Sequence, residues 1–206
     1  MLKFLFQGDS ITDADRIRDN DNNYGFGYPN LFVADVSKNR VGEFEFVNRG
    51  ISGNRIVDVY ARIKRDILNL KPDYMSILIG VNDVWHELAD CNGVAPEKFE
   101  KVYGMLIEEI LEALPNIKIL ILEPFVLKGT ATSEKWDAFH SGVLENAKIA
   151  KRIAEKYKLT FVPLQKKFDE AVVDDDTAYW LADGVHPTGA GHQIIKEELM
   201  KAFDSI

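Results

Sequence analysis

Short apolar runs alternate with amphipathic segments along the whole chain. Runs of this kind predict buried β-strands, and we expect five of them, at Leu2–Gln7, Phe44–Asn48, Tyr74–Ile79, Ile117–Leu122 and Leu159–Val162. The other segments carry a helical pattern, at about Tyr28–Lys38, Ile56–Asn69, Pro96–Leu114, Glu134–Lys158 and Gly189–Phe203. Strands that alternate with helices predict a parallel sheet with right-handed crossovers and helices on both of its faces.

The expected helix over Ile56–Asn69 has the clearest periodicity. Its apolar residues recur at the spacing that forms one face of a helix, namely Ile56, Val59, Tyr60, Ile63, Ile67 and Leu70. Pro72 and Pro115 each close a predicted helix just before the next strand. The 206 residues contain no internal repeat, low-complexity tract or linker, so we expect one domain over residues 1–206.

Charge and cysteine content narrow the classes of protein that this sequence fits. The net charge of −8, without any basic tract, argues against a nucleic acid or an anionic membrane as partner. No apolar run is long enough for a membrane span, and the run that begins at Leu2 is too short for a signal peptide. The one cysteine, Cys91, cannot form an internal disulfide, which fits a reducing compartment. We therefore expect a soluble, cytoplasmic protein.

The segment Phe4–Thr12 joins the first predicted strand to a polar, helical stretch. Its sequence Gly8-Asp9-Ser10 places Ser10 at the carboxyl end of a parallel strand, where α/β sheets bind their ligands. A helix that starts there would bring its partial positive charge close to an oxyanion formed at Ser10. Taken alone, the motif favours an ordinary N-cap serine, so its significance depends on the segments that follow.

Three further polar segments have the composition of a reaction site, at Asn48–Arg55, Gly80–Trp85 and Asp183–Pro187. The first two directly follow predicted strands, and the third precedes the last helix. A parallel sheet brings the carboxyl ends of its strands to one edge. We therefore expect these segments and Ser10 to face one crevice.

Together the four segments supply the groups that acyl transfer needs: a nucleophile, a base, a group that orients the base, and donors for the oxyanion. Ser10 fits the nucleophile and His186 the base. Asp183, three residues before His186, can turn its carboxylate onto the other imidazole nitrogen. The backbone N–H groups of Ser10 and Gly53 and the side-chain amide of Asn82 are the candidates for the oxyanion hole.

Several of these residues have a simpler structural interpretation. Gly53 competes with Gly50 for the role of backbone donor, because either glycine could merely form a turn. Asn82 could cap the helix or turn after the third strand. Asp183 precedes a glycine and is also a good turn former.

We also assign Asp9, Trp85 and His86 to the substrate pocket, with Trp85 and His86 beside the acyl group. A partly buried loop anchor is the alternative for both of these residues. His192 is expected to be a packing or surface histidine. The polar runs 19–23 and 174–176 are expected to be solvated loops. No set of His, Cys and acidic residues has the spacing of a metal site, and no glycine loop fits a phosphate, so we expect neither metal nor cofactor.

In this order, the four segments resemble the SGNH (GDSL-type) hydrolases, a family named for its serine, glycine, asparagine and histidine. The resemblance implies a three-layer α/β/α sandwich, attack of the serine on an ester, and an oxyanion held by glycine and asparagine. Asn-Arg-Gly-Ile-Ser-Gly-Asn and Gly-Val-Asn-Asp-Val-Trp are similar to segments of intracellular bacterial carbohydrate acetylesterases, particularly those that deacetylate xylo-oligosaccharides. Many members have a glycine shortly after the nucleophile motif, where this chain has Asp13-Ala14-Asp15-Arg16.

We therefore expect a single SGNH-hydrolase domain with a flavodoxin-like, five-stranded parallel sheet. Its predicted activity is that of a serine esterase that removes short acyl groups, with acetyl as the expected group, from a hydroxylated small substrate or an oligosaccharide such as acetylated xylo-oligosaccharide. A lysophospholipase, a thioesterase or a platelet-activating-factor acetylhydrolase-like enzyme is the alternative within the family. A non-catalytic carbohydrate-binding protein on a hydrolase fold is the alternative from another class. The relatives alone suggest a homo-oligomer.

Overall fold

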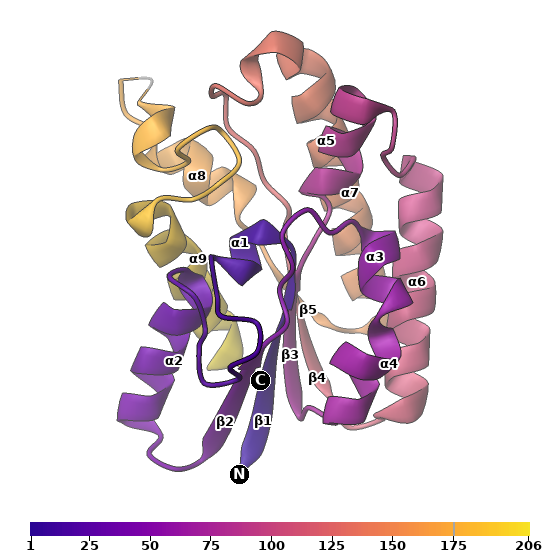
Figure 1. The fold of residues 1–206 in the computed structure, drawn as a ribbon, viewed down its shortest axis with the longest axis vertical. Helices are drawn as coiled ribbons and strands as arrows, with labels where there is room; N and C mark the ends of the chain where they lie inside the picture. Colours follow the sequence, from indigo (N-terminus) through magenta and orange to yellow (C-terminus); the bar gives the residue numbers. More distant parts are fainter. Residues whose placement is uncertain (175) are drawn as a thin grey trace.

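A five-stranded, all-parallel sheet forms the centre of the computed structural model, which describes residues 1–174 and 176–206 (Figure 1). The strands are β1 (Leu2–Gly8), β2 (Phe44–Asn48), β3 (Tyr74–Leu78), β4 (Lys118–Leu122) and β5 (Thr160–Val162). Their order in the sheet is β2-β1-β3-β4-β5, and every neighbouring pair is parallel. This is the flavodoxin-like order, in which the chain reverses its direction of winding between β1 and β3. The predicted strands are confirmed, with ends that differ by at most one residue.

Helices cover both faces of the sheet and complete the three-layer α/β/α sandwich (Figure 1). They are α1 (Ser10–Asp13), α2 (Tyr28–Asn39), α3 (Ile56–Ala61), α4 (Ile63–Asp66), α5 (Val81–Asp90), α6 (Pro96–Ala113), α7 (Trp136–Tyr157), α8 (Gln165–Ala171) and α9 (Gly189–Phe203). Short 3₁₀ turns occupy Leu68–Leu70, Ser133–Lys135 and Thr177–Tyr179. No helix within the described ranges has the length and apolar character needed to cross a membrane.

Two apolar cores lie on opposite faces of the sheet. Phe4 and Phe6 of β1 belong to one core, where they pack with Phe32 of α2 and Phe203 of α9. Leu5 points the other way, into the core that α3, α4, α6 and part of α7 cover. Because successive side chains of a strand alternate between faces, one apolar run serves both cores. The sheet is thereby fixed from both sides, and its carboxyl edge becomes a rigid support.

The expected single helix over Ile56–Asn69 is wrong. The structure divides it into α3, α4 and a 3₁₀ turn, and the first interruption lies at Arg62. The guanidinium of Arg62 turns inward, where it donates to the carbonyl oxygens of Gly8 at 3.2 Å and Arg49 at 2.8 Å and to Asn54 Oδ1 at 2.8 Å. These tertiary hydrogen bonds compensate for the intrahelical bonds that the break removes.

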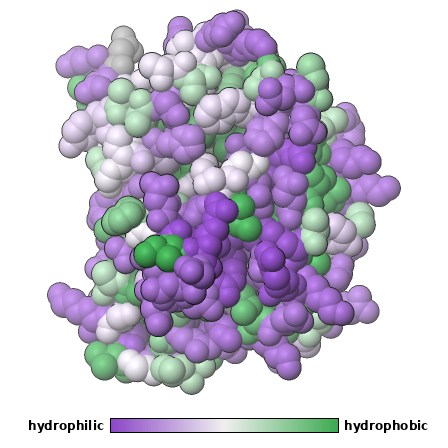
Figure 2. Space-filling view, in the orientation of Figure 1, coloured by the Kyte–Doolittle hydropathy of each residue, from purple (hydrophilic) through white to green (hydrophobic). Residues whose placement is uncertain are grey.

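Two helices, α5 and α8, were not predicted. In α5 the apolar residues Val81, Val84, Trp85 and Leu88 have helical spacing, but Gly80–Trp85 is expected above as a polar strand end, with a helix or a turn at Asn82 given only as an alternative. Of the two predicted solvated runs, 19–23 is an exposed turn in which Asp21 binds Arg49. In the run 174–176, residue 175 lies outside the described residues. The face in Figure 2 is mostly hydrophilic, with scattered apolar side chains.

Candidate active site

Ser10 lies where β1 ends and α1 begins. The preceding residue, Asp9, is the N-cap of α1, and its Oδ1 accepts the N–H of Ile11 at 3.0 Å. This cap fixes the turn that presents Ser10 at the floor of a cavity. The N–H of Ser10 makes no hydrogen bond with any residue in the described ranges. It is therefore free to bind a ligand above the sheet edge.

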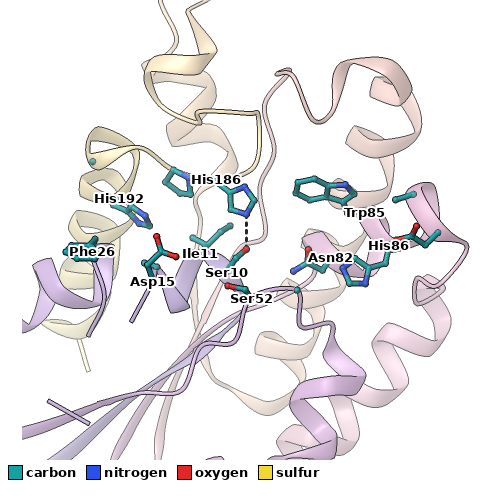
Figure 3. Close-up of a pocket in the computed structure, with 16 residues that line it drawn as sticks. Ser10, Ile11, Asp15, Phe26, Ser52, Asn82, Trp85, His86, His186 and His192 are labelled. Carbon is teal, nitrogen blue, oxygen red and sulfur yellow. Dashed lines mark hydrogen bonds between the residues drawn. The ribbon is translucent and has the colours of Figure 1, made fainter. Parts of the chain in front are cut away.

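His186 lies directly above Ser10 and comes from the segment that precedes α9 (Figure 3). Its Nε2 is 3.0 Å from Ser10 Oγ, and its Nδ1 is 2.7 Å from Asp183 Oδ2. The second oxygen of Asp183, Oδ1, accepts the N–H groups of Val185 at 2.9 Å and of His186 at 2.8 Å. The three side chains thus form a continuous hydrogen-bonded chain from carboxylate to hydroxyl, the arrangement of a Ser-His-Asp triad.

The segment that carries Asp183 and His186 is closed on itself. The N–H of Ala182 donates to the carbonyl oxygen of His186 at 2.8 Å, and an antiparallel bridge joins Leu181 to Pro187. Gly184 adopts φ +98°, a left-handed conformation that glycine adopts without strain, at the tip of this turn. The aspartate and the histidine are consequently held by the same small loop.

The electrostatics of this pair favour an ionised carboxylate. Burial alone raises the pKa of Asp183, but hydrogen bonds from the His186 ring and from two backbone N–H groups outweigh it and lower that pKa to about 2. The hydrogen bond to Asp183 in turn raises the pKa of His186 above its ordinary value, against the effect of burial. The carboxylate therefore holds the proton on Nδ1 and leaves Nε2 to accept the proton of Ser10.

Gly53 and Asn82 lie beside Ser10 on the cavity wall, as the sequence predicts. Gly53 adopts φ +80°, and its N–H has no partner among the described residues. Asn82 is the second residue of α5, and its Nδ2 donates one hydrogen to the Asn54 carbonyl oxygen at 3.1 Å. A primary amide carries two such hydrogens, so one remains for a ligand. Three residues that line the same cavity as Ser10 Oγ therefore each keep an N–H without a partner among the described residues.

Packing and hydrogen bonding distinguish Gly50 from Gly53 as candidate backbone donors for the oxyanion. A Cβ on Gly50 would lie 2.3 Å from the backbone nitrogen of Asp13, so this glycine is required for close contact between two chain segments. Its own N–H donates to Asn48 Oδ1 at 2.8 Å and is therefore already used. Only Gly53 of the two lines the cavity.

The cavity has a volume of about 780 Å³ and extends to both sides of Ser10. Trp85 and His86 of α5 line one side, where the sequence analysis placed them. The Trp85 ring centroid lies 5.7 Å from that of His186 and 5.8 Å from that of Phe139. Trp85 thus forms an apolar wall next to the predicted base.

Asp9 does not lie on the cavity wall, contrary to the expectation for a pocket residue. Its side chain is 1% exposed and is turned beneath Ser10, because one carboxylate oxygen caps α1. The other oxygen, Oδ2, is buried without a hydrogen-bond partner among the described residues. Burial raises the pKa of Asp9 to about 7, although the Ile11 N–H and the charge of His186 act to lower it.

Several residues that line the cavity are not among the predicted pocket residues, chiefly Asp15, Phe26 and Ser52. His192 was expected to pack or to face solvent, and the structure places it on the cavity wall with 8% of its surface exposed. Its position six residues after His186, on the helix that follows the loop, could have indicated that His192 lies near the cavity. Within the described ranges, no group of three or more His, Cys, Asp or Glu side chains has the arrangement of a metal site.

The fold and the geometry of this site are those of a GDSL-type hydrolase. The chain belongs to the GDSL-like Lipase/Acylhydrolase family, whose sequence model matches residues 6–194. It is 32% identical over 210 residues to an acetylxylan esterase of Geobacillus stearothermophilus, an alignment that covers 97% of this chain and 92% of that enzyme. These findings make the chain a carboxylic ester hydrolase.

Solved structures extend the similarity to three dimensions. A protein of Parabacteroides merdae described as a GDSL-like lipase superposes with a TM-score of 0.93 at 35% identity, covering 98% of this chain and 95% of that one. The acetylxylan esterase Axe2 of Geobacillus stearothermophilus superposes with a TM-score of 0.87 at 31% identity, covering 98% and 93%. Catalytic mutants of Axe2 replace a serine, an aspartate and a histidine by alanine.

Proposed function

We propose that this protein is a serine esterase that removes acetyl groups from an acetylated oligosaccharide, such as acetylated xylo-oligosaccharide, through an acyl-enzyme on Ser10. The observation that carries the proposal is the chain of hydrogen bonds from Asp183 through His186 to Ser10, at 2.7 Å and 3.0 Å, at the floor of an open cavity. A variant of Axe2 is described as an acetyl-xylo-oligosaccharide esterase, which supports the choice of substrate.

In the first half of the reaction, Ser10 Oγ attacks the ester carbonyl carbon while His186 Nε2 takes the hydroxyl proton. The carbonyl oxygen becomes an oxyanion, which the N–H groups of Ser10 and Gly53 and the free hydrogen of Asn82 bind. Each such donor contributes roughly 3–4 kcal/mol to the stability of the transition state. Asp183 stabilises the imidazolium that forms at this stage.

The tetrahedral intermediate then collapses, and the bond between the carbonyl carbon and the alcohol oxygen breaks. His186 returns its proton to the departing alcohol, which leaves an acetyl ester on Ser10. In the second half, a water molecule takes the place of the alcohol and His186 removes one of its protons. The water oxygen bonds to the acyl carbon, the bond between that carbon and Ser10 Oγ breaks as His186 gives its proton to Oγ, and acetate leaves with the hydroxyl of Ser10 restored.

We place the acyl group on the side of Trp85 and His86. The Trp85 ring stands 5.7 Å from His186, which leaves a short apolar space next to the reacting carbon. Polar side chains interrupt the cavity wall, among them Ser52 and, on α5 beside Trp85 and His86, Asp90. A long acyl chain would require a continuous apolar channel, so this lining favours an acetyl group over the lipid or thioester substrates of other family members.

The decisive experiment is an acyl-chain series on p-nitrophenyl acetate, butyrate and octanoate, followed by acetate release from acetylated xylo-oligosaccharide. We expect kcat/KM to fall steeply from acetyl to butyryl and to be negligible for octanoyl. Equal or faster octanoyl hydrolysis would move the assignment to a lysophospholipase or thioesterase. Binding of xylo-oligosaccharide without hydrolysis of any ester would favour the non-catalytic carbohydrate-binding protein.

We further infer that residues 1–206 form a single SGNH-hydrolase domain. This is supported by the two cores that share one sheet and by a site whose residues come from both ends of the chain. The homo-oligomer and the cytoplasmic location stay predictions.

A further inference from the structure

The two ends of the cavity differ in chemistry. Trp85 and His86 line one end, and Asp15, Phe26 and His192 line the other, with Ser10 between them (Figure 3). The second group comes from the loop between α1 and α2 and from α9. None of its three residues takes part in the mechanism described above, so their presence on the cavity wall calls for a separate explanation.

We propose that Asp15, Phe26 and His192 form a subsite for the sugar ring that carries the acetyl group. The proposal rests on the proposed function, because it assigns the alcohol part of the same ester to this end of the cavity. The ring would lie with one face on Phe26, while its hydroxyl groups donate to Asp15 and accept from His192. We refer to these three residues as the sugar subsite.

The carboxylate of Asp15 is exposed, lines the cavity and accepts no hydrogen bond from any described residue. Its backbone has φ +57°, and that of the preceding Ala14 has φ +42°. Two consecutive left-handed residues other than glycine cost conformational energy, which is typical of sites where side-chain direction matters. Ala14 and Asp15 belong to the segment after the nucleophile motif in which many family members have a glycine. A carboxylate held in this way can accept hydrogen bonds from two neighbouring sugar hydroxyls.

His192 complements Asp15 because it presents a donor. Its Nδ1 accepts the backbone N–H of Tyr28 at 3.1 Å, so the ring proton of the neutral imidazole lies on Nε2. The ring stays neutral because burial, together with the charge of His186, lowers the pKa of His192 to about 4. The subsite therefore contains one acceptor and one fixed donor, as recognition of hydroxyl groups requires.

Phe26 supplies an apolar surface at the mouth of the cavity. It is 81% exposed, which is unusual for a large aromatic side chain that lines a cavity. Its N–H donates to the carbonyl oxygen of Ala14 at 2.8 Å, and a Cβ on the neighbouring Gly27 would lie 2.7 Å from the His192 ring. The backbone at Phe26 is thus held between the segment of Asp15 and the His192 ring. A sugar ring that covers it would bury apolar surface on both partners.

The position of the base agrees with this assignment. His186 must protonate the leaving oxygen, so the alcohol part of the substrate lies against His186 during the reaction. Pro187, Gly189 and His192 continue the cavity wall from His186 toward the sugar subsite. The carbonyl oxygen is directed instead toward Gly53 and Asn82, and the methyl group fits the apolar wall at Trp85. In this arrangement the alcohol part, the carbonyl oxygen and the methyl group each contact cavity residues of complementary polarity.

The test compares two acetate esters that differ only in the alcohol, acetylated xylobiose and ethyl acetate, the second of which has neither a ring nor a hydroxyl group. For the wild type and for Phe26→Ala and Asp15→Asn, kcat and KM are measured on both esters by acetate release. We expect the ratio of kcat/KM for xylobiose to that for ethyl acetate to fall at least about tenfold in each variant, mainly through KM.

Two exposed residues of the same loop that do not line the cavity provide matched controls. Ile17→Ala removes an apolar side chain that is 55% exposed, and Asp19→Asn removes a negative charge. Neither control should change the ratio by more than about twofold. In a Ser10→Ala background, which prevents turnover, calorimetric titration with acetylated xylobiose should show the same order of affinities.

A ratio that stays constant in both subsite variants, or that falls equally in the controls, would overturn the sugar subsite while leaving the esterase assignment in place. Failure of the proposed function has a different signature: the wild type would hydrolyse ethyl acetate but neither bind nor deacetylate any acetylated xylobiose. That outcome would refute both the carbohydrate substrate and the subsite.

Discussion

Replacing Asp183 by asparagine should damage the esterase by moving one proton. Asp183 uses both oxygens: Oδ1 accepts the N–H groups of Val185 and His186, and Oδ2 accepts the His186 ring. Asparagine has a single oxygen, and the two backbone donors hold it. Its NH₂ group then faces His186 Nδ1, which has to accept. The ring proton consequently moves to Nε2, where it blocks proton transfer from Ser10.

The expected loss of kcat/KM in Asp183→Asn follows from the free energy needed to rotate the introduced side-chain amide by about 180°. The flipped side chain loses two backbone hydrogen bonds and points an NH₂ group at two N–H donors, a penalty of about 3–4 kcal/mol. The competent tautomer becomes rarer by roughly 10²–10³-fold, and we expect kcat/KM to fall by at least that factor. The loss stays smaller than that in Ser10→Ala or His186→Ala, which remove a reacting group altogether.

The assay is kcat/KM on p-nitrophenyl acetate for variants of matched thermal stability, with ¹⁵N chemical shifts of the imidazole to identify the tautomer. Asp183→Ala is the informative control, because it removes the carboxylate without introducing an amide and leaves the ring free to protonate Nδ1. We therefore expect Asp183→Ala to retain more activity than Asp183→Asn. The reverse order, or an Asp183→Asn variant less active than His186→Ala, would refute this account of the base.

Three further predictions concern the nucleophile, pH and the glycines. Ser10→Ala should abolish turnover without loss of the fold, and a fluorophosphonate should label the wild type once, at Ser10, by mass spectrometry; full activity of the variant would exclude the mechanism. Activity should rise with pH through an apparent pKa above 6.5, because His186 must be neutral to act as the base and its pKa is raised. In Asp183→Asn this rise in activity should occur at lower pH, because the hydrogen bond to the carboxylate that raises the pKa of His186 is lost. Because the pKa of Asp183 falls from 3.8 to about 2 on folding, its contribution to stability is present above pH 3.8 and is lost as the pH falls toward 2. Gly53→Ala should cost about 1–2 kcal/mol from its left-handed backbone, whereas Gly50→Ala, with a Cβ 2.3 Å from a backbone nitrogen, should cost about 3 kcal/mol or more in urea unfolding.

The strands and the meeting of Ser10 with His186 could be predicted because both follow from simple patterns. Apolar runs of four to six residues mark the strands, and a parallel sheet necessarily brings their carboxyl ends together. The three-residue offset between Asp183 and His186 likewise limits how the two side chains meet.

Other features could not be predicted, because they depend on contacts between distant residues. The periodic apolar face of Ile56–Asn69 contains no sign of its interruption at Arg62, which follows from hydrogen bonds to Gly8 and Arg49. The orientation of Asp9 beneath Ser10 depends on a choice between capping a helix and facing the cavity, and both are compatible with its position. Phe26 reaches the cavity only through the folding of a loop with no regular pattern.

The loop that holds Asp183 and His186 fixes these two residues relative to each other by local hydrogen bonds. Because the bond from Ala182 to His186 and the bridge from Leu181 to Pro187 close this loop on itself, acid and base move together as one body. The separation between Ser10 and His186 is then the only distance in the triad that long-range folding has to set. A substitution that shifts either this loop or the turn after β1 can therefore inactivate the enzyme by lengthening the 3.0 Å distance between Ser10 Oγ and His186 Nε2, while the hydrogen bond between Asp183 and His186 is kept.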